Sequence, residues 1–385
     1  MNSTQIPHLD SNQQQASDAL ARIIAAEIAQ HGAIPFSRFM ELALYAPQYG
    51  YYTGGAHKIG AGGDFITAPV LSPLFGQTLA RQIAPLLAQT AGNVYEFGAG
   101  TGALAVSLLN ALSGCLNTYY IVELSPELAA RQSQYIQQHA PDLAHKVKHL
   151  TALPASFDGV ILGNEVLDAM PSERICRHEN GDFSRVYVGY ENGQFALQYQ
   201  SLLDPDLFQA ALNYFPENAG EYTSELHPAQ HAFIRTLAEK LTRGAMIWLD
   251  YGFDAAQYYH PERSDGTLIG HHRHHSIHDP FFRVGLTDLT VHVNFSDIAA
   301  AGCDAGLDLI GYTNQATFLY NLGILDLLAA QFPQTDTPSY FQAAQAVNTL
   351  TAQHEMGELF KVMAFGRGVE VDWPGFARGD MCHKL

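Results

Sequence analysis

One stretch of the chain combines a glutamate with three glycines at a spacing that suits a small-ligand site. Residues 94–102 read VYEFGAGTG, with β-favouring residues up to Phe97 and glycines at Gly98, Gly100 and Gly102. Glycine at alternate positions allows a sharp turn and a close approach of the backbone to a ligand. Because helix-forming residues follow over 103–112, that helix would direct its unpaired N–H groups at the ligand. The spacing predicts a site for an adenosyl-containing ligand in an α/β protein.

The nature of this ligand depends on the carboxylates around the glycines. Gly98, Gly100 and Ala103 also fit the dinucleotide pattern G-x-G-x-x-G/A, which keeps an NAD site open. Glu96, inside the strand, would attract a cationic amino-acid head group and repel an anionic pyrophosphate. Glu123 ends the next predicted strand, where a carboxylate can accept hydrogen bonds from both ribose hydroxyls. S-adenosylmethionine is therefore the favoured cofactor. The residues assigned to it here are Glu96, Gly98, Gly100, Gly102 and Glu123.

Polar residues at the end of a later predicted strand are the candidates for catalysis. Asn164 and Glu165 end the predicted strand 157–165 and Asp168 follows it, and this end of a parallel sheet is where ligands bind. If a helix began there, Asn164 and Asp168 would share one of its faces, although Asn164 could instead cap that helix. Asp250 ends the fifth predicted strand and either joins the site or forms a turn. We select Asn164, Glu165 and Asp168 as the catalytic residues.

A glycine-rich segment upstream of the sheet supplies two further candidates. Asp64 and Thr67 lie within residues 60–69, which read GAGGDFITAP. Such a loop could fold over the cofactor as a lid, with an ordinary turn as the alternative. Asp64 and Thr67 are therefore added to the predicted cofactor-binding residues.

The elements that must position these residues predict an α/β fold. Strands and helices alternate over 93–164, which is typical of a parallel sheet, whereas 174–200 contains short strands joined by hairpin turns. We therefore predict a Rossmann-like sheet with an N-terminal helical segment, an antiparallel β insertion and helical C-terminal additions. The strand 359–365 is expected at an antiparallel edge. The predicted divisions are a disordered tail over 1–15, a helical segment with the glycine-rich lid over 16–90, the cofactor-binding domain over 91–366 with insertions at about 174–226, 253–295 and 316–355, and a C-terminal tail over 367–385.

Composition limits the partners of the chain. Its 385 residues include 38 acidic and 20 basic side chains, a formal charge of −18. Such a chain repels nucleic-acid backbones and suits a basic protein partner, unless the charge serves only solubility. No signal peptide, transit peptide or long apolar run is visible, so a cytoplasmic protein without membrane insertion is expected. The histidines within 271–278 lack the rigid spacing of a zinc site, and no metal is predicted.

Several strings of residues together resemble the MidA-like proteins, a family that includes the mitochondrial complex I assembly arginine methyltransferase. The strings fall within 63–69, 96–102, 122–126, 164–171, 250–252, 266–268, 278–280, 288–293 and 356–362. Val70 and Pro73 depart from the pattern, because many members carry Glu and Gln there. The resemblance implies a class I Rossmann-like methyltransferase that uses S-adenosylmethionine.

The function predicted from these features is protein arginine N-methylation. A protein partner is expected, with a respiratory complex I-type subunit as one candidate, and the oligomeric state stays open with a homodimer as one option. Three alternatives remain at this point. They are an assembly chaperone that binds the cofactor and catalyses little, a methyltransferase for a carboxylate or small-molecule acceptor, and an NAD-dependent oxidoreductase.

Overall fold

A central eight-stranded sheet organises the computed structural model, which describes residues 8–54, 67–217 and 219–385. The strand order is β15-β16-β10-β5-β2-β3-β4, and β14 pairs with β10. Neighbours from β4 to β10 run parallel, while β16 is antiparallel to both of its neighbours. The bounds are β2 Asn93–Phe97, β3 Thr118–Val122, β4 Val147–Leu150, β5 Phe157–Asn164, β10 Leu241–Phe253, β14 Val293–Asn294, β15 Asp308–Asn314 and β16 Phe360–Arg367. The predicted α/β class is confirmed.

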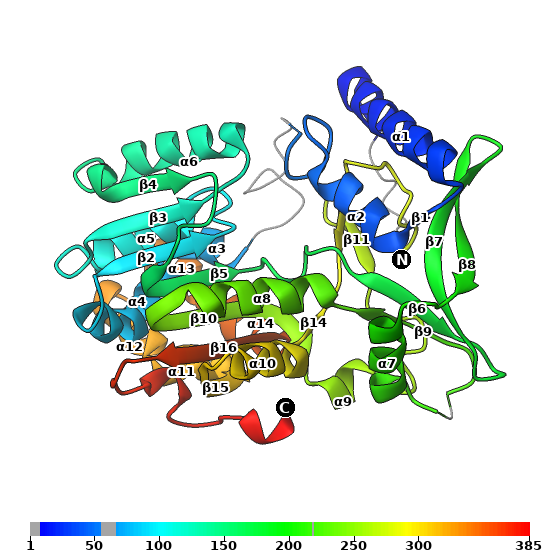
Figure 1. The fold of residues 1–385 in the computed structure, drawn as a ribbon. Coiled ribbons are helices and arrows are strands. Elements are labelled where there is room, and N and C mark those ends of the chain that lie inside the picture. Colours follow the sequence, from blue (N-terminus) through cyan, green and yellow to red (C-terminus); the bar gives the residue numbers. More distant parts are fainter. Residues whose placement is uncertain (1–7, 55–66, 218) are drawn as a thin grey trace.

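Helices cover both faces of this sheet, because successive strand residues point to opposite sides. Val94 packs with one helical layer and Tyr95 with the other. The first layer contains α4 Pro73–Ala88, α5 Ala103–Ala111, α6 Pro126–His139, α11 Gln315–Asn321, α12 Ile324–Gln331 and α13 Pro338–Thr351. The second contains α8 Pro228–Lys240 and α10 Phe295–Asp304, seen in front of the sheet in Figure 1. Two short helices are α3 Ala68–Leu71 and α14 Met356–Leu359.

The N-terminal helices and the antiparallel strands gather beside the central sheet, on the right of Figure 1. One small sheet has the order β1-β7-β6-β9, with β8 on β7, and a second has the order β12-β11-β13. The strands are β1 Ile34–Pro35, β6 Glu173–Arg177, β7 Phe183–Glu191, β8 Gln194–Ser201, β9 Tyr222–Leu226, β11 Ile269–His272, β12 His275–Ile277 and β13 Asp288–Thr290. The associated helices are α1 Ser11–His31, α2 Phe36–Tyr45, α7 Pro205–Tyr214 and α9 Ala255–Tyr258.

Two local predictions are wrong. Residues 11–15 are not a disordered tail, since α1 begins at Ser11 and Asp10 and Gln13 form a capping box. The last strand, β16, is not at an edge, because β15 pairs with its outer side. The segment after β16 packs back onto this edge, where Asp380 accepts a hydrogen bond from the Tyr312 N–H at 2.9 Å.

None of the helices in the described ranges combines the length and the apolar character that a membrane crossing needs.

Candidate active site

A cavity of about 950 Å³ opens at the carboxyl ends of β2, β3, β5 and β10. Its opposite wall comes from outside the parallel sheet, from the end of α2, the turn after it, and β13. The ends of the parallel strands meet here because all of them run in one direction across the sheet. The cavity therefore lies between the sheet and the N-terminal and antiparallel parts of the chain.

The glycine turn forms the floor of this cavity after β2. Gly98, Gly100 and Gly102 have φ values of +64°, +52° and +87°, a region that favours glycine. A Cβ at Gly98 would also lie only 2.8 Å from the Val166 Cγ2 atom. Gly102 immediately precedes α5, whose first residue Ala103 lines the cavity. The backbone conformation thus favours glycine at all three positions, and the turn leaves room for a ligand against the helix N-terminus.

Glu123 lies at the tip of β3, at the edge of the cavity. Its Oε1 accepts a hydrogen bond from the Ser125 N–H at 2.9 Å, and its Oε2 accepts one from Gln132 Nε2 at 3.1 Å. Gln132 Nε2 also donates to the Gly100 carbonyl at 3.1 Å. The sequence reasoning missed Gln132. Its position on the inward face of α6, four residues before the buried Ile136, was the available signal.

Glu96 faces the cavity from within β2 and is only 2% exposed. The Tyr119 hydroxyl donates a hydrogen bond to its Oε2 at 2.7 Å. Burial nevertheless raises the pKa of Glu96 to about 7, because a charged carboxylate loses its hydration there.

The β5 tip carries the three predicted catalytic residues, but no helix begins there. Asn164 is the last strand residue, and Glu165 has φ +54°, so the chain enters a turn instead. The predicted shared helix face of Asn164 and Asp168 and the predicted helix cap are therefore wrong. Asp250 explains the turn, since its Oδ2 accepts hydrogen bonds from the N–H groups of Val166, Leu167 and Asp168 at 3.1, 2.9 and 3.3 Å. Asp250 positions the turn.

The turn brings Asn164, Glu165 and Asp168 together at the cavity wall. Asn164 Nδ2 donates to Glu165 Oε1 at 3.0 Å, and the Tyr251 hydroxyl donates to Asp168 Oδ2 at 2.6 Å. Burial and the nearby Asp168 charge raise the pKa of Glu165 to about 8. Burial also raises the pKa of Asp168, against the lowering effect of the Tyr251 hydrogen bond. Among the described residues, nothing donates a hydrogen bond to Asp168 Oδ1 or Asn164 Oδ1.

Aromatic residues that the site prediction missed form the wall opposite the sheet. The rings of Tyr45 and Tyr52 are stacked, with centroids 5.5 Å apart and an interplanar angle of 24°. The Tyr52 hydroxyl lies 2.9 and 3.1 Å from the two carboxylate oxygens of Asp288. Tyr45 donates to the Ala169 carbonyl at 3.0 Å. The signal in the sequence was the Tyr51-Tyr52 pair, in a run rich in turn residues, and the string containing Asp288, which served only for the family resemblance.

The two lid candidates are placed differently. Thr67 lines the cavity just before α3, and its side chain makes no capping hydrogen bond. Asp64 lies outside the described residues, as does most of the predicted lid.

Among the charged side chains in the described lining of the cavity, most are acidic. The carboxylates are Glu41, Glu96, Glu123, Glu165, Asp168, Glu173 and Asp288. The lining guanidinium, Arg38, already forms ion pairs with Glu27 and Glu41. No ion pair found within the described ranges includes Glu96, Glu165 or Asp168. The cavity therefore suits cationic ligands.

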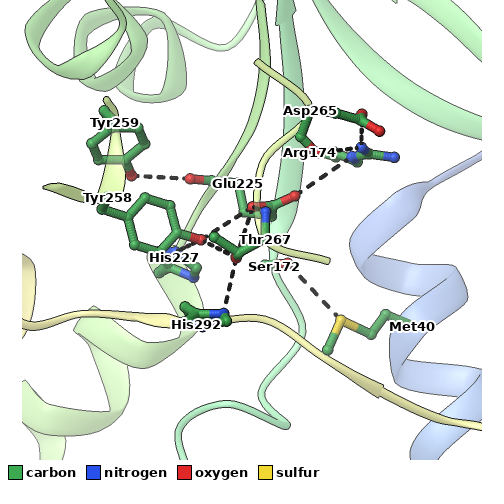
Figure 2. Close-up of polar contacts among 10 residues, drawn as sticks. All are labelled: Met40, Ser172, Arg174, Glu225, His227, Tyr258, Tyr259, Asp265, Thr267 and His292. Atoms are coloured by element: carbon green, nitrogen blue, oxygen red, sulfur yellow. Dashed lines mark hydrogen bonds and ion pairs between the residues drawn. The ribbon is translucent and has the colours of Figure 1, made fainter. Parts of the chain in front are cut away.

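A second group of buried polar residues, drawn in Figure 2, holds the loops behind the β13 wall. Glu225 on β9 is fully buried, and its Oε1 lies 3.5 Å from Arg174 Nε. Its Oε2 accepts hydrogen bonds from the Thr267 N–H at 2.8 Å and the Tyr258 hydroxyl at 3.1 Å. Thr267 Oγ1 in turn accepts from the His292 N–H at 3.0 Å. Because Thr267 precedes β11 and His292 follows β13, this group anchors both paired strands.

Comparison with known proteins agrees with this geometry. Residues 78–313 match a family model described as "putative S-adenosyl-L-methionine-dependent methyltransferase". A Burkholderia thailandensis crystal structure with bound S-adenosyl-homocysteine is 46% identical, with a TM-score of 0.94 over 99% of this chain and 100% of that one. The mitochondrial protein arginine methyltransferase NDUFAF7 of Danio rerio is 27% identical over 89% of this chain and 86% of its own length. The human NDUFAF7 is 26% identical over 90% and 82%.

The chain belongs to this family of S-adenosyl-L-methionine-dependent methyltransferases. It is an enzyme that uses S-adenosylmethionine as its methyl donor. The residues of the cavity fit that cofactor, because Gly98 leaves a cradle that a Cβ would fill and because the surrounding carboxylates complement a sulfonium cation.

Proposed function

We propose that the enzyme transfers the methyl group to a guanidino nitrogen of an arginine in a protein partner. The observation that carries this proposal is the pair of buried carboxylates, Glu165 and Asp168, beside the β5 tip and outside every ion pair found in the described ranges. A guanidinium stays charged at all accessible pH values and is recognised best by carboxylates in a planar, bidentate manner. The NDUFAF7 relatives, named as protein arginine methyltransferases, support the same acceptor.

The cofactor is proposed to occupy the side of the cavity formed by the tips of β2 and β3. Gly98, Gly100 and Gly102 would let the backbone approach it, and Glu123 would accept hydrogen bonds from its ribose hydroxyls. Glu96 would face its cationic portion. Thr67, which lines the cavity, and Asp64 keep their proposed cofactor-binding roles.

The catalytic residues would orient the acceptor. The bound cofactor supplies a methyl group on a cationic sulphur, so the protein has mainly to align a nucleophile with it at about 3 Å. Asp168 is held by Tyr251 through one oxygen and presents the other, Oδ1, without a hydrogen bond from the described residues. Glu165, whose pKa burial and Asp168 raise to about 8, is suited to take up the proton that the methylated nitrogen releases. Asn164 keeps the Glu165 carboxylate in place through its 3.0 Å hydrogen bond.

The partner proposed is a basic protein segment, with a respiratory complex I-type subunit as the first candidate and the cytoplasm as the location. The acidic cavity and the formal charge of −18 favour a cationic partner over nucleic acid.

The test is methyl transfer into a lysate from a strain that lacks the gene. With radiolabelled S-adenosylmethionine, the wild-type enzyme should label protein, and acid hydrolysis should release labelled methylarginine. The Asp168→Asn variant is the control, which should bind S-adenosyl-homocysteine with unchanged affinity and label roughly 100-fold less. Base-labile label would indicate a carboxylate acceptor, label in small molecules would indicate a metabolite acceptor, and no label at all would favour the chaperone alternative.

A further inference from the structure

We propose that Asp288, together with the stacked rings of Tyr45 and Tyr52, forms a clamp that recognises the guanidinium of the acceptor arginine. This inference rests on the proposed function and names the residues that select the acceptor. The clamp lies on the wall of the cavity that the parallel sheet does not provide.

The two tyrosines connect the clamp to the β5 turn. Tyr45 donates to the Ala169 carbonyl, next to Asp168, and Tyr52 donates to Asp288. Because the two rings stack on each other, they link the segment that carries Asp168 with the segment that carries Asp288. The Val291 N–H also donates to the Asp168 carbonyl at 3.0 Å, which fixes the same two segments through the backbone. The carboxylate of Asp168, beside the β5 tip, and that of Asp288, on the opposite wall, are thus linked by these contacts.

The chemistry of this wall matches a guanidinium better than an ammonium. A planar guanidinium stacks on aromatic faces and donates hydrogen bonds to carboxylates from its edge, whereas a lysine ammonium is a compact, strongly hydrated charge. The clamp offers aromatic rings and a carboxylate within hydrogen-bonding distance of one of them. An aliphatic arginine stem would pack against the same rings.

The position of Asp288 is set before any ligand arrives. β13 pairs with β11, with His271 opposite Asp288 and Ile269 opposite Thr290. Thr267, held by Glu225, anchors the start of β11, and its hydroxyl accepts from the His292 N–H beyond the end of β13 (Figure 2). A carboxylate supported at both ends of its strand keeps its geometry, which is the condition for selective recognition.

The clamp and the cofactor side of the cavity come from different elements and can be separated by mutation. Asp288 belongs to β13, whereas the proposed cofactor residues belong to β2, β3 and the turn after β2. Asp288→Asn should therefore weaken acceptor binding and leave cofactor affinity alone. Asp142→Asn is the matched control, since it makes the same change of charge at an exposed residue outside the cavity lining.

The experiment is calorimetric binding of N-acetylarginine amide to the enzyme saturated with S-adenosyl-homocysteine. N-acetylcitrulline amide, which has a similar shape and no charge, is the probe for specificity. We expect the wild-type enzyme to prefer the arginine probe, Asp288→Asn to bind it at least tenfold more weakly, and Tyr52→Phe to bind it about threefold more weakly. Both variants should keep the wild-type affinity for S-adenosyl-homocysteine within twofold, and Asp142→Asn should match the wild type throughout.

Three results overturn the clamp. They are equal binding of the arginine and citrulline probes by the wild-type enzyme, undiminished arginine binding by Asp288→Asn, and a parallel loss of S-adenosyl-homocysteine affinity in that variant. The lysate assay separates this failure from failure of the proposed function. Methylarginine formed there by the wild type, together with any of these three results, removes the clamp and leaves arginine methylation in place.

Discussion

Two sets of buried carboxylates in this molecule differ in whether a positively charged side chain lies beside them. Glu225 is fully buried, but Arg174, Tyr258 and Thr267 surround it with a positive charge and hydrogen-bond donors. Glu165 and Asp168 are buried at the cavity, and the ion pairs of the described residues include neither of them. Burial and the nearby Asp168 charge raise the pKa of Glu165 to about 8, and the Asn164 hydrogen bond offsets this only in part.

The difference indicates which carboxylates serve the fold and which serve a ligand. A buried charge that the chain neutralises itself depends on its partners, so removing one of them destabilises the loops that contact it. A buried carboxyl group that the chain leaves uncompensated lowers stability when it ionises, and is retained where an incoming cation completes the site. Four measurements test this distinction.

The largest effect is expected from removing the cation at Glu225. Arg174→Met leaves that carboxylate buried without its ion pair, which should lower the free energy of unfolding by about 3–5 kcal/mol. Urea denaturation at pH 7.5 measures the change. Arg243→Met is the control, because its pair with Asp158 at 3.0 Å lies at the surface, where such pairs contribute below about 1 kcal/mol. Equal losses in the two variants would contradict the distinction.

Glu165→Gln is expected to change the free energy of unfolding in the opposite direction and to raise it at high pH. The folded protein raises the pKa of Glu165 from 4.5 to about 8. Between pH 4.5 and pH 8 the folded state therefore keeps Glu165 protonated, whereas the unfolded state ionises it. Stability from this group is therefore present at low pH and lost as pH rises towards 8. At pH 8.5 the free energy of unfolding of the variant should be about 4 kcal/mol higher than that of the wild type, and at pH 4.5 the two should nearly agree.

The control for Glu165→Gln is Glu225→Gln, which should be destabilising at both pH values because it removes the buried negative charge that faces Arg174 and accepts hydrogen bonds from Thr267 and Tyr258. Urea titrations across the pH range measure both variants. A Glu165→Gln protein that is less stable than the wild type at pH 8.5 would show that Glu165 has a structural role like that of Glu225.

A third measurement compares two cofactor forms that differ in charge. S-adenosylmethionine carries the sulfonium charge and S-adenosyl-homocysteine does not. Protonation of Glu96, with a pKa of about 7, and of Glu165 removes the complementary negative charge as pH falls. The preference for the charged form should therefore decline about tenfold between pH 8.5 and pH 6, as measured by calorimetry with both compounds. Glu96→Gln should flatten this dependence, whereas a constant ratio in the wild type would place the sulphur away from both carboxylates.

The smallest effect is expected from Tyr251→Phe. This change removes the 2.6 Å hydrogen bond that lowers the pKa of Asp168, so that pKa should rise further. The acid limb of the pH–rate profile should shift to higher pH by about one pH unit, and the maximal rate should fall severalfold. Tyr45→Phe removes a hydroxyl that donates to the Ala169 carbonyl and should leave the acid limb in place. A limb that does not move in Tyr251→Phe would mean that another group controls it.

Local signals in the sequence predicted the sheet and the glycine turn, because both depend on residues adjacent in the chain. The capping box of Asp10 and Gln13 was equally local and was overlooked in a polar segment. The conformation after β5 could not be read in this way. Asp250 stabilises that turn from 82 to 84 residues away, through hydrogen bonds that the local sequence does not indicate.

The acceptor wall depends on still longer separations. Tyr52 and Asp288 meet across 236 residues, and Tyr45 and Ala169 across 124. No spacing rule connects such positions, since they come together only when α2 and the antiparallel strands pack beside the sheet. The carboxylates at the strand tips were therefore predictable, and their aromatic neighbours were not.

The central place of β16 has a consequence for biosynthesis. This strand pairs with β10 on one side and β15 on the other, although its residues, Phe360–Arg367, come after both in the chain. A ribosome that has not yet translated residue 360 therefore holds a nascent protein in which β10 and β15 both expose unpaired backbone groups. Incomplete products would be prone to edge-to-edge aggregation and to quality-control proteolysis, so the sheet can close only late in synthesis.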